Sequence, residues 1–295
     1  MIYIKNLDDN LSIIIVNYNG GQFLLDCLDS LQTASIKLDI WVVDNASSDG
    51  SIDEAQKKHP TVNYIKNSQN LGFAKANNQA LKKVRSEYIL LLNPDCIVSS
   101  HTLDYMLTFM KTHTDVGAAS CKVEHKNGSI DWASHRGFPT PWVSFLYFAL
   151  GDDSLYHQTY KDMRTEHEVD SISGAFFMTR KSVLDKVGFF DEDYFLYAED
   201  IDLCFRIKEK GFKIIYVPDV VALHHKGITS GIKLHSKEIS TAQDTSRKRA
   251  LNSFYITMKI FYKKHLEKKY PFFINALVYL GINLRWFLAR HKMHV

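Results

Sequence analysis

Cysteine is scarce in this sequence, which holds four among 295 residues. None of them forms a CxxC pair or has a spacing typical of metal ligands: Cys27, Cys96, Cys121 and Cys204. A disulfide framework is therefore excluded, and we expect the reduced thiols of a cytosolic protein. A signal peptide is not expected either, because Asp8 and Asp9 precede only a short isoleucine-rich run.

Glycine-rich phosphate-binding motifs are also missing. No GxGxxG follows the first apolar run, and GxxxxGKS/T occurs nowhere in the chain. These absences argue against a dinucleotide-binding Rossmann domain and against a P-loop nucleotidase.

Acidic residues are almost absent from the C-terminal part of the chain. Residues 247–295 carry eleven lysines and arginines but one acid, Glu267, whereas residues 1–246 carry 25 basic and 32 acidic residues. The net charge of +3 therefore conceals a basic tail. Such an asymmetry indicates an acidic partner at one end of the protein, either a membrane or a nucleic acid.

What the sequence does contain is an alternation of short apolar runs and amphipathic segments. Helices are expected at residues 75–86 and 100–111 among others, and strands at residues 11–16, 39–43, 62–65, 88–92 and 116–123. Right-handed crossovers between successive strands make them parallel. The pattern is typical of an α/β fold with a doubly wound, mostly parallel sheet.

The most informative stretch is the apolar run Tyr88–Leu92, which is followed by Asn93, Pro94 and Asp95. Pro94 cannot donate to a sheet ladder, so the chain must turn there. This places Asp95 at the carboxyl end of a central strand, where open α/β sheets bind ligands. Asp95 and the neighbouring Asn93 could hold a divalent cation that bridges nucleotide phosphates. The alternative is an ordinary turn capped by the aspartate.

Two other polar loops follow predicted strands, at Asn17–Gly21 and at Asp44–Gly50. Because these loops and Asp95 follow three parallel strands, they can converge at one edge of the sheet. The Asp44 carboxylate and backbone groups of the first loop could read a nucleobase there. Each loop alone is equally well explained as a simple turn.

An acidic cluster marks the start of another predicted helix. Glu199, Asp200 and Asp202 fall at its N-terminus, where the helix dipole alone would favour anions. Partial burial would raise a carboxylate pKa towards the range of a general base. Such burial is indicated by the aromatic residues nearby: Tyr194, Phe195 and Tyr197.

A strand expected at residues 213–217 should end at Pro218, and His224 and His225 follow it. A neutral imidazole there could join Asp95 on a cation or contact phosphate, although incidental histidines are the more common case.

Residues 127–168 show no periodicity. Such a long irregular insertion is often a lid or an acceptor-binding loop.

Together these stretches resemble glycosyltransferase family 2, and most closely its bacterial rhamnosyltransferase-like members, which build surface polysaccharides. The resemblance spans roughly residues 11–230, in the family's order. The segments that carry it are Ile13–Asn19, Val42–Ser51, Asn70–Asn78, Leu91–Asp95, Ser173–Arg180, Phe189–Arg206 and His224–Gly227. It implies an inverting enzyme with the GT-A fold. The catalytic domain would cover residues 1–246, with a nucleotide-sugar half at about 1–125 and an acceptor half at about 126–246, and residues 247–295 would form a helical extension.

The resemblance also implies residue roles. Asp200 matches the catalytic base, with Glu199 beside it. Asp95 matches the last aspartate of the DXD metal-binding motif, and His224 matches the histidine that completes the site for Mg²⁺ or Mn²⁺, with His225 as its competitor. The implied donor-binding residues are Asn17, Tyr18, Asp44, Asn45, Asn70, Lys75 and Asn93. Asn93 departs from the pattern because it replaces the first aspartate of the motif, which leaves one carboxylate for the metal.

The implied donor is dTDP-L-rhamnose, with UDP-hexoses next, and the implied acceptor is a hydroxyl of a saccharide or of a lipid-linked molecule rather than a nucleic acid. Two alternatives stay open. A sugar nucleotidyltransferase usually opens with a glycine-rich loop and a basic residue, which Asn17–Gly21 lacks. A non-catalytic nucleotide-sugar binding module would need no base at Asp200.

The basic tail contains two predicted helical segments. Residues 251–262 are amphipathic, and residues 272–289 are mostly apolar but include Asn275, Asn283 and Arg285. The second segment is borderline for a transmembrane span and fits an interfacial helix better. We expect the tail to hold the protein on the inner face of the cell membrane. Packing against the catalytic domain and an oligomer interface are the alternatives.

Overall fold

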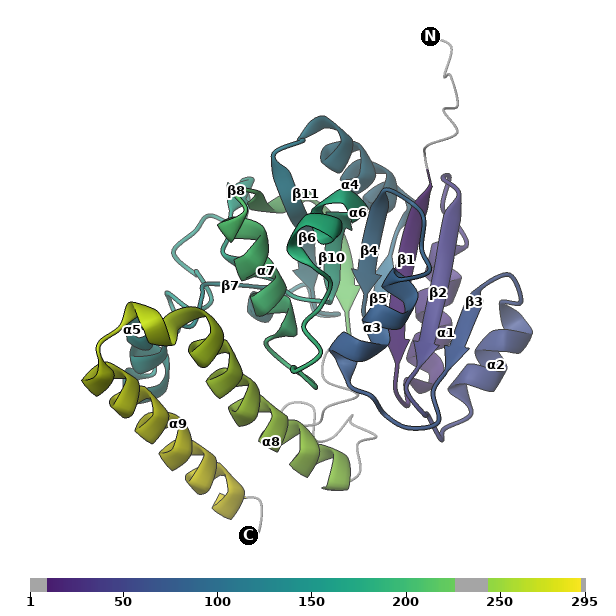
Figure 1. Ribbon diagram of the computed structural model, residues 1–295. Helices are drawn as coiled ribbons and strands as arrows, with labels where there is room; N and C mark the ends of the chain where they lie inside the picture. Colours follow the sequence, from purple (N-terminus) through teal and green to yellow (C-terminus); the bar gives the residue numbers. More distant parts are fainter. Residues whose placement is uncertain (1–9, 226–243, 293–295) are drawn as a thin grey trace.

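The computed structural model describes residues 10–225 and 244–292 of the chain (Figure 1). Its centre is a sheet with the order β3-β2-β1-β4-β10-β6-β11-β5, and β8 pairs with β11. The strands of this sheet are β1 Leu11–Asn17, β2 Leu38–Asp44, β3 Asn63–Lys66, β4 Tyr88–Leu92, β5 Cys96–Val98, β6 Val116–Glu124, β8 His167–Glu168, β10 Phe176–Arg180 and β11 Lys213–His224.

The doubly wound, mostly parallel sheet that the sequence predicts is confirmed. β1 runs parallel to β2 and β4, β2 runs parallel to β3, and β6 runs parallel to β11. β10 is inserted antiparallel between β4 and β6. The strands β1, β2 and β4 therefore end at the same edge of the sheet, and their following loops lie there.

Helices cover both faces of the sheet because its central strands are apolar on both sides. Along β1, Leu11, Ile13 and Ile15 belong to one buried cluster, whereas Ile14 and Val16 belong to the other. The first cluster is completed by α1 Gly21–Leu31, α2 Ser51–Lys58 and α4 Ser100–Thr112. The second is completed by α3 Phe73–Leu81, α6 Lys181–Val187 and α7 Glu199–Glu209.

Two predicted boundaries are wrong. α3 ends at Leu81, five residues before the predicted end of the 75–86 helix. β11 does not end at Pro218 but continues to His224, with a shift of register against β6 between Val217 and Val221. An irregularity of this kind lets a strand pass a residue that has no N–H donor. His224 therefore lies inside the sheet, opposite Cys96 of β5.

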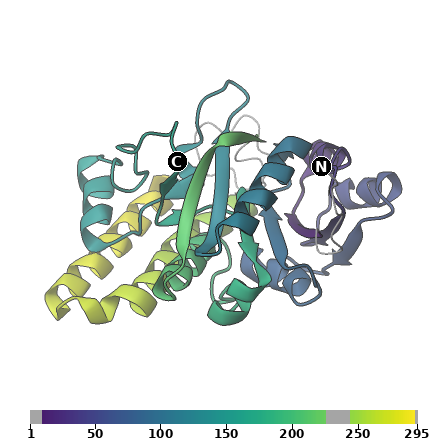
Figure 2. The ribbon, with the colours of Figure 1, turned by 90° about the horizontal axis from the view of Figure 1, so that it is seen from above.

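The irregular insertion at residues 127–168 contains only short elements. They are a 3₁₀ turn Trp132–Ser134, β7 His135–Arg136, α5 Pro141–Phe145, a π-helical turn Leu146–Leu150 and β8. β7 pairs with β9 Ser171–Ile172 in a separate two-stranded sheet. In Figure 2, α5 lies at one end of the molecule beside the C-terminal helices.

The tail forms a helical hairpin, visible in yellow-green and yellow in Figure 1. It consists of α8 Asp244–Phe261, a π-helical turn Tyr262–Leu266, a 3₁₀ turn Glu267–Lys269 and α9 Phe272–Lys292. The bend of the hairpin packs on α7 and on the segment before it. His265 Nε2 lies 2.7 Å from Asp202 Oδ1. The apolar part of this contact comprises Tyr194, Ile201, Phe205, Phe261, Tyr262 and Leu266.

α9 is mostly exposed, in contrast to the bend. Within the described residues, Phe272–His291 is long and apolar enough to cross a membrane by length and composition, and 6% of its most apolar window is buried. The side chains that pack towards α8 include Ile282, which is buried, and Trp286, which is partly buried. The hairpin therefore packs on α7 through its bend and leaves an apolar helix face uncovered.

Candidate active site

The polar loops after β1 and β2 meet at the edge of the sheet where the sequence predicts them. Asn17 and Asp44 are register partners at the ends of their strands. The Asn17 side-chain amide donates to Asp44 Oδ1 at 3.0 Å, and the Ser47 N–H donates to Asp44 Oδ2 at 3.1 Å. The side chains of Asn17 and Asp44 are both buried. Asn17 Oδ1 has no hydrogen-bond partner among the described residues, which leaves a buried acceptor in the predicted nucleobase site.

Asn45 shapes the loop that follows β3. Its amide nitrogen donates to the Gly72 carbonyl at 3.0 Å. Gly72 has φ +86°, and a Cβ at this position would lie 2.3 Å from the Phe195 carbonyl oxygen, so no side chain fits there. The Phe73 N–H donates to the same oxygen at 2.7 Å. This loop is therefore attached to the segment that precedes α7.

The other predicted donor-binding residues lie around these two loops. Asn70 accepts from the Gly72 N–H at 2.9 Å, and Lys75 is exposed in the first turn of α3. Tyr18 and Asn93 are partly exposed at the ends of β1 and β4. Unlike Asp44 and Asn45, these four residues offer side chains that solvent can reach.

Asp95 and His224, the predicted metal ligands, are in direct contact. His224 Nε2 lies 3.2 Å from Asp95 Oδ1, and His224 Nδ1 lies 3.0 Å from Asp131 Oδ2. Burial alone would lower the pKa of His224, but the carboxylates of Asp95 and Asp131 raise it to about 9. The histidine ring is therefore fixed between two carboxylates, one from the turn after β4 and one from the insertion.

His225 contacts Asp95 only through the backbone, where its N–H donates to the Asp95 carbonyl at 2.9 Å. Its ring lies beside Phe23, with centroids 5.1 Å apart. Of the two histidines, His224 is thus the one whose ring contacts the Asp95 carboxylate.

Cys96 is also within reach of this cluster. Its thiol donates to the Ala175 carbonyl at 3.2 Å, and burial raises its pKa well above the usual value, so it stays neutral.

This donor set fits a hard divalent cation. A carboxylate is a ligand for either cation, and an imidazole is one for Mn²⁺ once its Nε2 has released its proton to make room for the metal, whereas a protonated thiol is not a ligand. Asp95 and His224 provide two ligand atoms, so diphosphate oxygens and water would have to supply the others.

Asp200, the predicted base, forms an ion pair that the sequence does not predict. Arg136 Nη2 donates to Asp200 Oδ2 at 2.7 Å, and both residues are largely buried. Burial opposes the charge of Arg136, but Asp200 raises its pKa, so the guanidinium stays charged. Its Nε is buried and has no partner within the described part of the chain.

Glu199, the neighbouring carboxyl, is in a different state. It is buried, and its Oε2 has no hydrogen-bond partner in residues 10–225 or 244–292. Burial and the adjacent Asp200 raise the pKa of Glu199 to about 8. The two neighbouring carboxyl groups thus differ in their partners: Asp200 pairs with the charged Arg136, and Glu199 Oε2 is buried without a partner among the described residues.

Comparison with known proteins identifies the family of the chain. A family model described as "Glycosyl transferase family 2" matches residues 12–188, which is more than half of the chain. The chain belongs to glycosyl transferase family 2. It is therefore a glycosyltransferase, an enzyme that transfers a sugar.

Two relatives have names that describe rhamnosyl transfer. The N-acetylglucosaminyl-diphospho-decaprenol L-rhamnosyltransferase of Mycobacterium tuberculosis is 28% identical over 243 residues, which are 76% of this chain and 79% of that protein. The rhamnosyltransferase WbbL of Escherichia coli K12 is 28% identical over 261 residues, which are 82% of this chain and 94% of WbbL. The predicted resemblance to rhamnosyltransferase-like members of the family is confirmed.

Solved structures of glycosyltransferases share the fold. Residues 1–349 of S. aureus TarS superpose with a TM-score of 0.54 at 17% identity, covering 87% of this chain and 72% of that one. GalNAc-T7 superposes with a TM-score of 0.56 at 13% identity, covering 84% of this chain and 48% of that one. The predicted GT-A fold is thereby confirmed.

Sequence reasoning missed two residues of this glycosyltransferase, Asp131 and Arg136. Both lie in the insertion, where no period relates a residue to a strand end or to a helix face. The only signal was the presence of isolated charges in a largely aromatic stretch. Asp202, by contrast, supports the fold, because its carboxylate accepts from Arg206 at 2.8 Å and contacts His265 of the tail.

Proposed function

We propose that this enzyme is an inverting glycosyltransferase that uses a nucleoside diphosphate sugar, with dTDP-L-rhamnose favoured and UDP-hexoses next. The acceptor is a hydroxyl of a saccharide or of a lipid-linked molecule. The names of the two relatives support rhamnose as the sugar. The observation that carries the proposal is the pair of Asp200 and Arg136 at the start of α7.

Asp200 acts as the general base in this mechanism. Its carboxylate takes the proton of the acceptor hydroxyl while that oxygen attacks the anomeric carbon opposite the leaving diphosphate. A single displacement of this kind inverts the anomeric centre. Burial and the adjacent Asp200 raise the pKa of Glu199, which favours its protonated form and makes Asp200 the base in this proposal. A well-placed general base contributes about 10²–10⁴-fold to the rate.

Asp95 and His224 would hold Mg²⁺ or Mn²⁺ at the end of β4. When bound, the cation neutralises the negative charge that the leaving diphosphate gains as the glycosidic bond breaks. Asp131 orients His224 by accepting the hydrogen bond of its second ring nitrogen. Asn17, Asp44 and the loop built by Asn45 bind the nucleoside.

The tail holds the enzyme on the cytoplasmic face of an anionic membrane. Eleven basic residues against one acid in residues 247–295 favour this location, and so does the exposed apolar face of α9. A lipid-linked acceptor would be found at the same surface.

A panel of nucleotide sugars with Mn²⁺ tests the donor. A ligand at about 100 times its Kd stabilises the folded protein by roughly 2.7 kcal/mol, which thermal unfolding detects readily. We expect the largest shift with dTDP-L-rhamnose, and release of the nucleoside diphosphate once an acceptor is added. Equal shifts with every sugar nucleotide, or no shift with any, would contradict the donor assignment.

A further inference from the structure

A second exposed apolar segment lies in the insertion, at residues 141–150. It contains no charged residue, and it comprises α5 and the π-helical turn that follows. Three of its large side chains are exposed: Trp142 by 60%, Phe145 by 50% and Leu150 by 65%. Side chains of this size and exposure are unusual on a purely aqueous surface and mark an interaction site.

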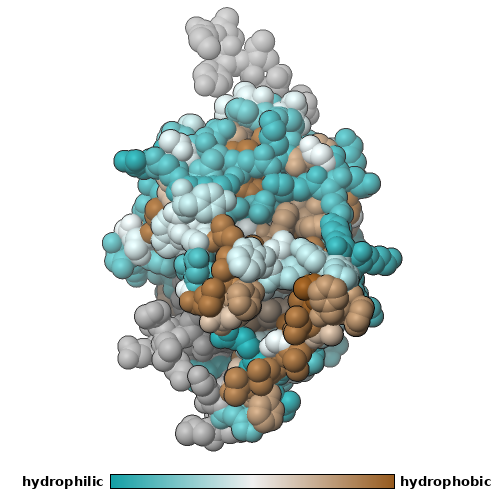
Figure 3. Space-filling model, turned by 90° about the vertical axis from the view of Figure 1, so that its left-hand side faces the viewer, coloured by the Kyte–Doolittle hydropathy of each residue, from teal (hydrophilic) through white to brown (hydrophobic). Residues whose placement is uncertain are grey.

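This segment is attached to α9, although 137 residues separate the two contact points. The Arg285 guanidinium donates to the Phe148 carbonyl and lies 4.7 Å from the centroid of the Phe148 ring. Figure 3 shows hydrophobic side chains gathered on this face of the molecule. The exposed residues that α9 adds are Phe272, Phe273, Leu277, Leu280, Leu284, Phe287 and Leu288.

We propose that residues 141–150 are a second membrane-inserting element, so that the enzyme binds an anionic bilayer through α9 and this segment together. The inference rests on the membrane role proposed for the tail. It adds a contact point in the catalytic part of the chain, so that the orientation of the active site towards the lipid surface is fixed.

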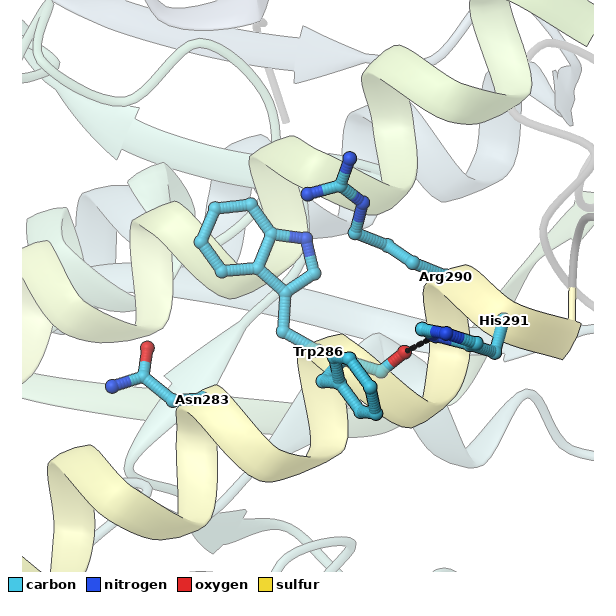
Figure 4. A pocket seen from close by; sticks show the side chains of 5 residues that line it. Asn283, Trp286, Arg290 and His291 are labelled. Carbon is cyan, nitrogen blue, oxygen red and sulfur yellow. Dashed lines mark hydrogen bonds between the residues drawn. The ribbon is translucent and has the colours of Figure 1, made fainter.

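The charge around this surface favours lipid over a second copy of the chain. Arg285 and Arg290 lie on α9, and Lys259 of α8 lies 4.9 Å from the Trp286 ring. Figure 4 shows Trp286, Arg290 and His291 around a hollow on α9. Tryptophan next to cations suits the headgroup region of a membrane.

The second contact point also limits which kind of acceptor can reach the proposed base. Arg136, the partner of Asp200, lies five residues before Pro141. Five residues span at most about 18 Å. The base would therefore act close to the bilayer surface, which suits a lipid-linked acceptor with a short saccharide better than a long free polysaccharide.

Site-specific labelling tests the insertion. All four cysteines are buried, so a single introduced thiol can carry an environment-sensitive fluorophore in the full-length protein. We would label Leu150→Cys in the segment and Leu284→Cys on α9. The control is Tyr160→Cys, because Tyr160 is 64% exposed in the same insertion but outside the segment. Vesicles of phosphatidylcholine and phosphatidylglycerol, with and without lipid-borne quenchers, serve as the probe.

We expect the labels at 150 and 284 to shift to the blue and to be quenched by the lipid, and the label at 160 to do neither. The doubly substituted Trp142→Ser/Phe145→Ser protein should bind the vesicles at least tenfold more weakly while keeping its transfer rate to a soluble acceptor. A label at 150 as exposed as the label at 160, with the label at 284 buried, would overturn the second contact and leave the tail alone on the membrane. Burial of the label at 150 without vesicles, at rising protein concentration, would show a second copy instead. If none of the three labels shifts or is quenched by the lipid, while transfer to a soluble acceptor is intact, both membrane contacts are refuted. The proposed reaction is not affected by that outcome.

Discussion

Replacing Glu199 by glutamine separates the two carboxyl groups at the start of α7. Glutamine has nearly the shape of a protonated glutamate, which is the form that the raised pKa of Glu199, about 8, favours at neutral pH. Glu199→Gln should therefore keep most of the transfer activity at pH 7. Asp200→Asn, which removes the proposed base, should lose at least about 10²-fold.

The same substitution has a calculable effect on stability. Below pH 4.5 the Glu199 carboxyl is protonated in both the folded and the unfolded protein, so its ionisation does not contribute to the free energy of unfolding there. As the pH rises from 4.5 to about 8, the unfolded chain releases the proton while the folded protein keeps it, so the free energy of unfolding falls. Each pKa unit corresponds to about 1.4 kcal/mol, and the full penalty above pH 8 is therefore roughly 5 kcal/mol.

Urea denaturation of the wild type and of Glu199→Gln at pH 5 and at pH 9 measures this penalty. We expect the two proteins to be similar at pH 5 and the variant to be more stable by several kcal/mol at pH 9. Glu54→Gln, on the exposed face of α2, is the matched control and should change stability by less than about 1 kcal/mol at either pH. A stability difference that does not change with pH would refute the protonated state of Glu199. A loss of transfer as large as that of Asp200→Asn would make Glu199 the base.

Three further predictions concern the partners of the proposed base and of the metal ligands. Arg136→Met leaves a buried carboxylate without its counter-ion, so it should lower the free energy of unfolding by about 3–5 kcal/mol in urea denaturation, and Arg136→Lys should recover part of the loss. Asp131→Asn should weaken Mn²⁺ binding by about 10–100-fold in a calorimetric titration, because it alters the hydrogen bond that orients His224. EDTA should abolish donor turnover, and added Mn²⁺ or Mg²⁺ should restore it. Full turnover in EDTA would refute a catalytic cation.

The fold was predictable because its signals are local. A strand buried on both faces, such as Tyr88–Leu92, is a continuous apolar run, and the turn at Pro94 follows from the missing N–H. The same reasoning failed at Pro218, because a shift of register against β6 is decided by the partner strand and not by the residue itself. Tertiary context overrode the local rule there.

The candidate site was predictable only where it follows the ends of regular elements. Asp44, Asp95 and the carboxyl groups of α7 were found in this way. Asp131 and Arg136 were not, because their place beside His224 and Asp200 depends on the path of an insertion without periodicity. The sequence placed Glu199 and Asp200 together at the start of a helix but did not indicate how they differ. Their difference comes from Arg136, which pairs with one carboxylate and leaves the other without a cation of its own.

Transfer by the Asp200→Asn protein, measured against the wild type, tests the proposed reaction most directly. The donor is the nucleotide sugar that gives the largest thermal shift, and the acceptor is a lipid-linked saccharide, with release of the nucleoside diphosphate followed over time. We predict that the variant binds the donor as tightly as the wild type but transfers the sugar at least about 10²-fold more slowly. Equal rates for the two proteins would show that Asp200 is not the base and would contradict the proposed mechanism.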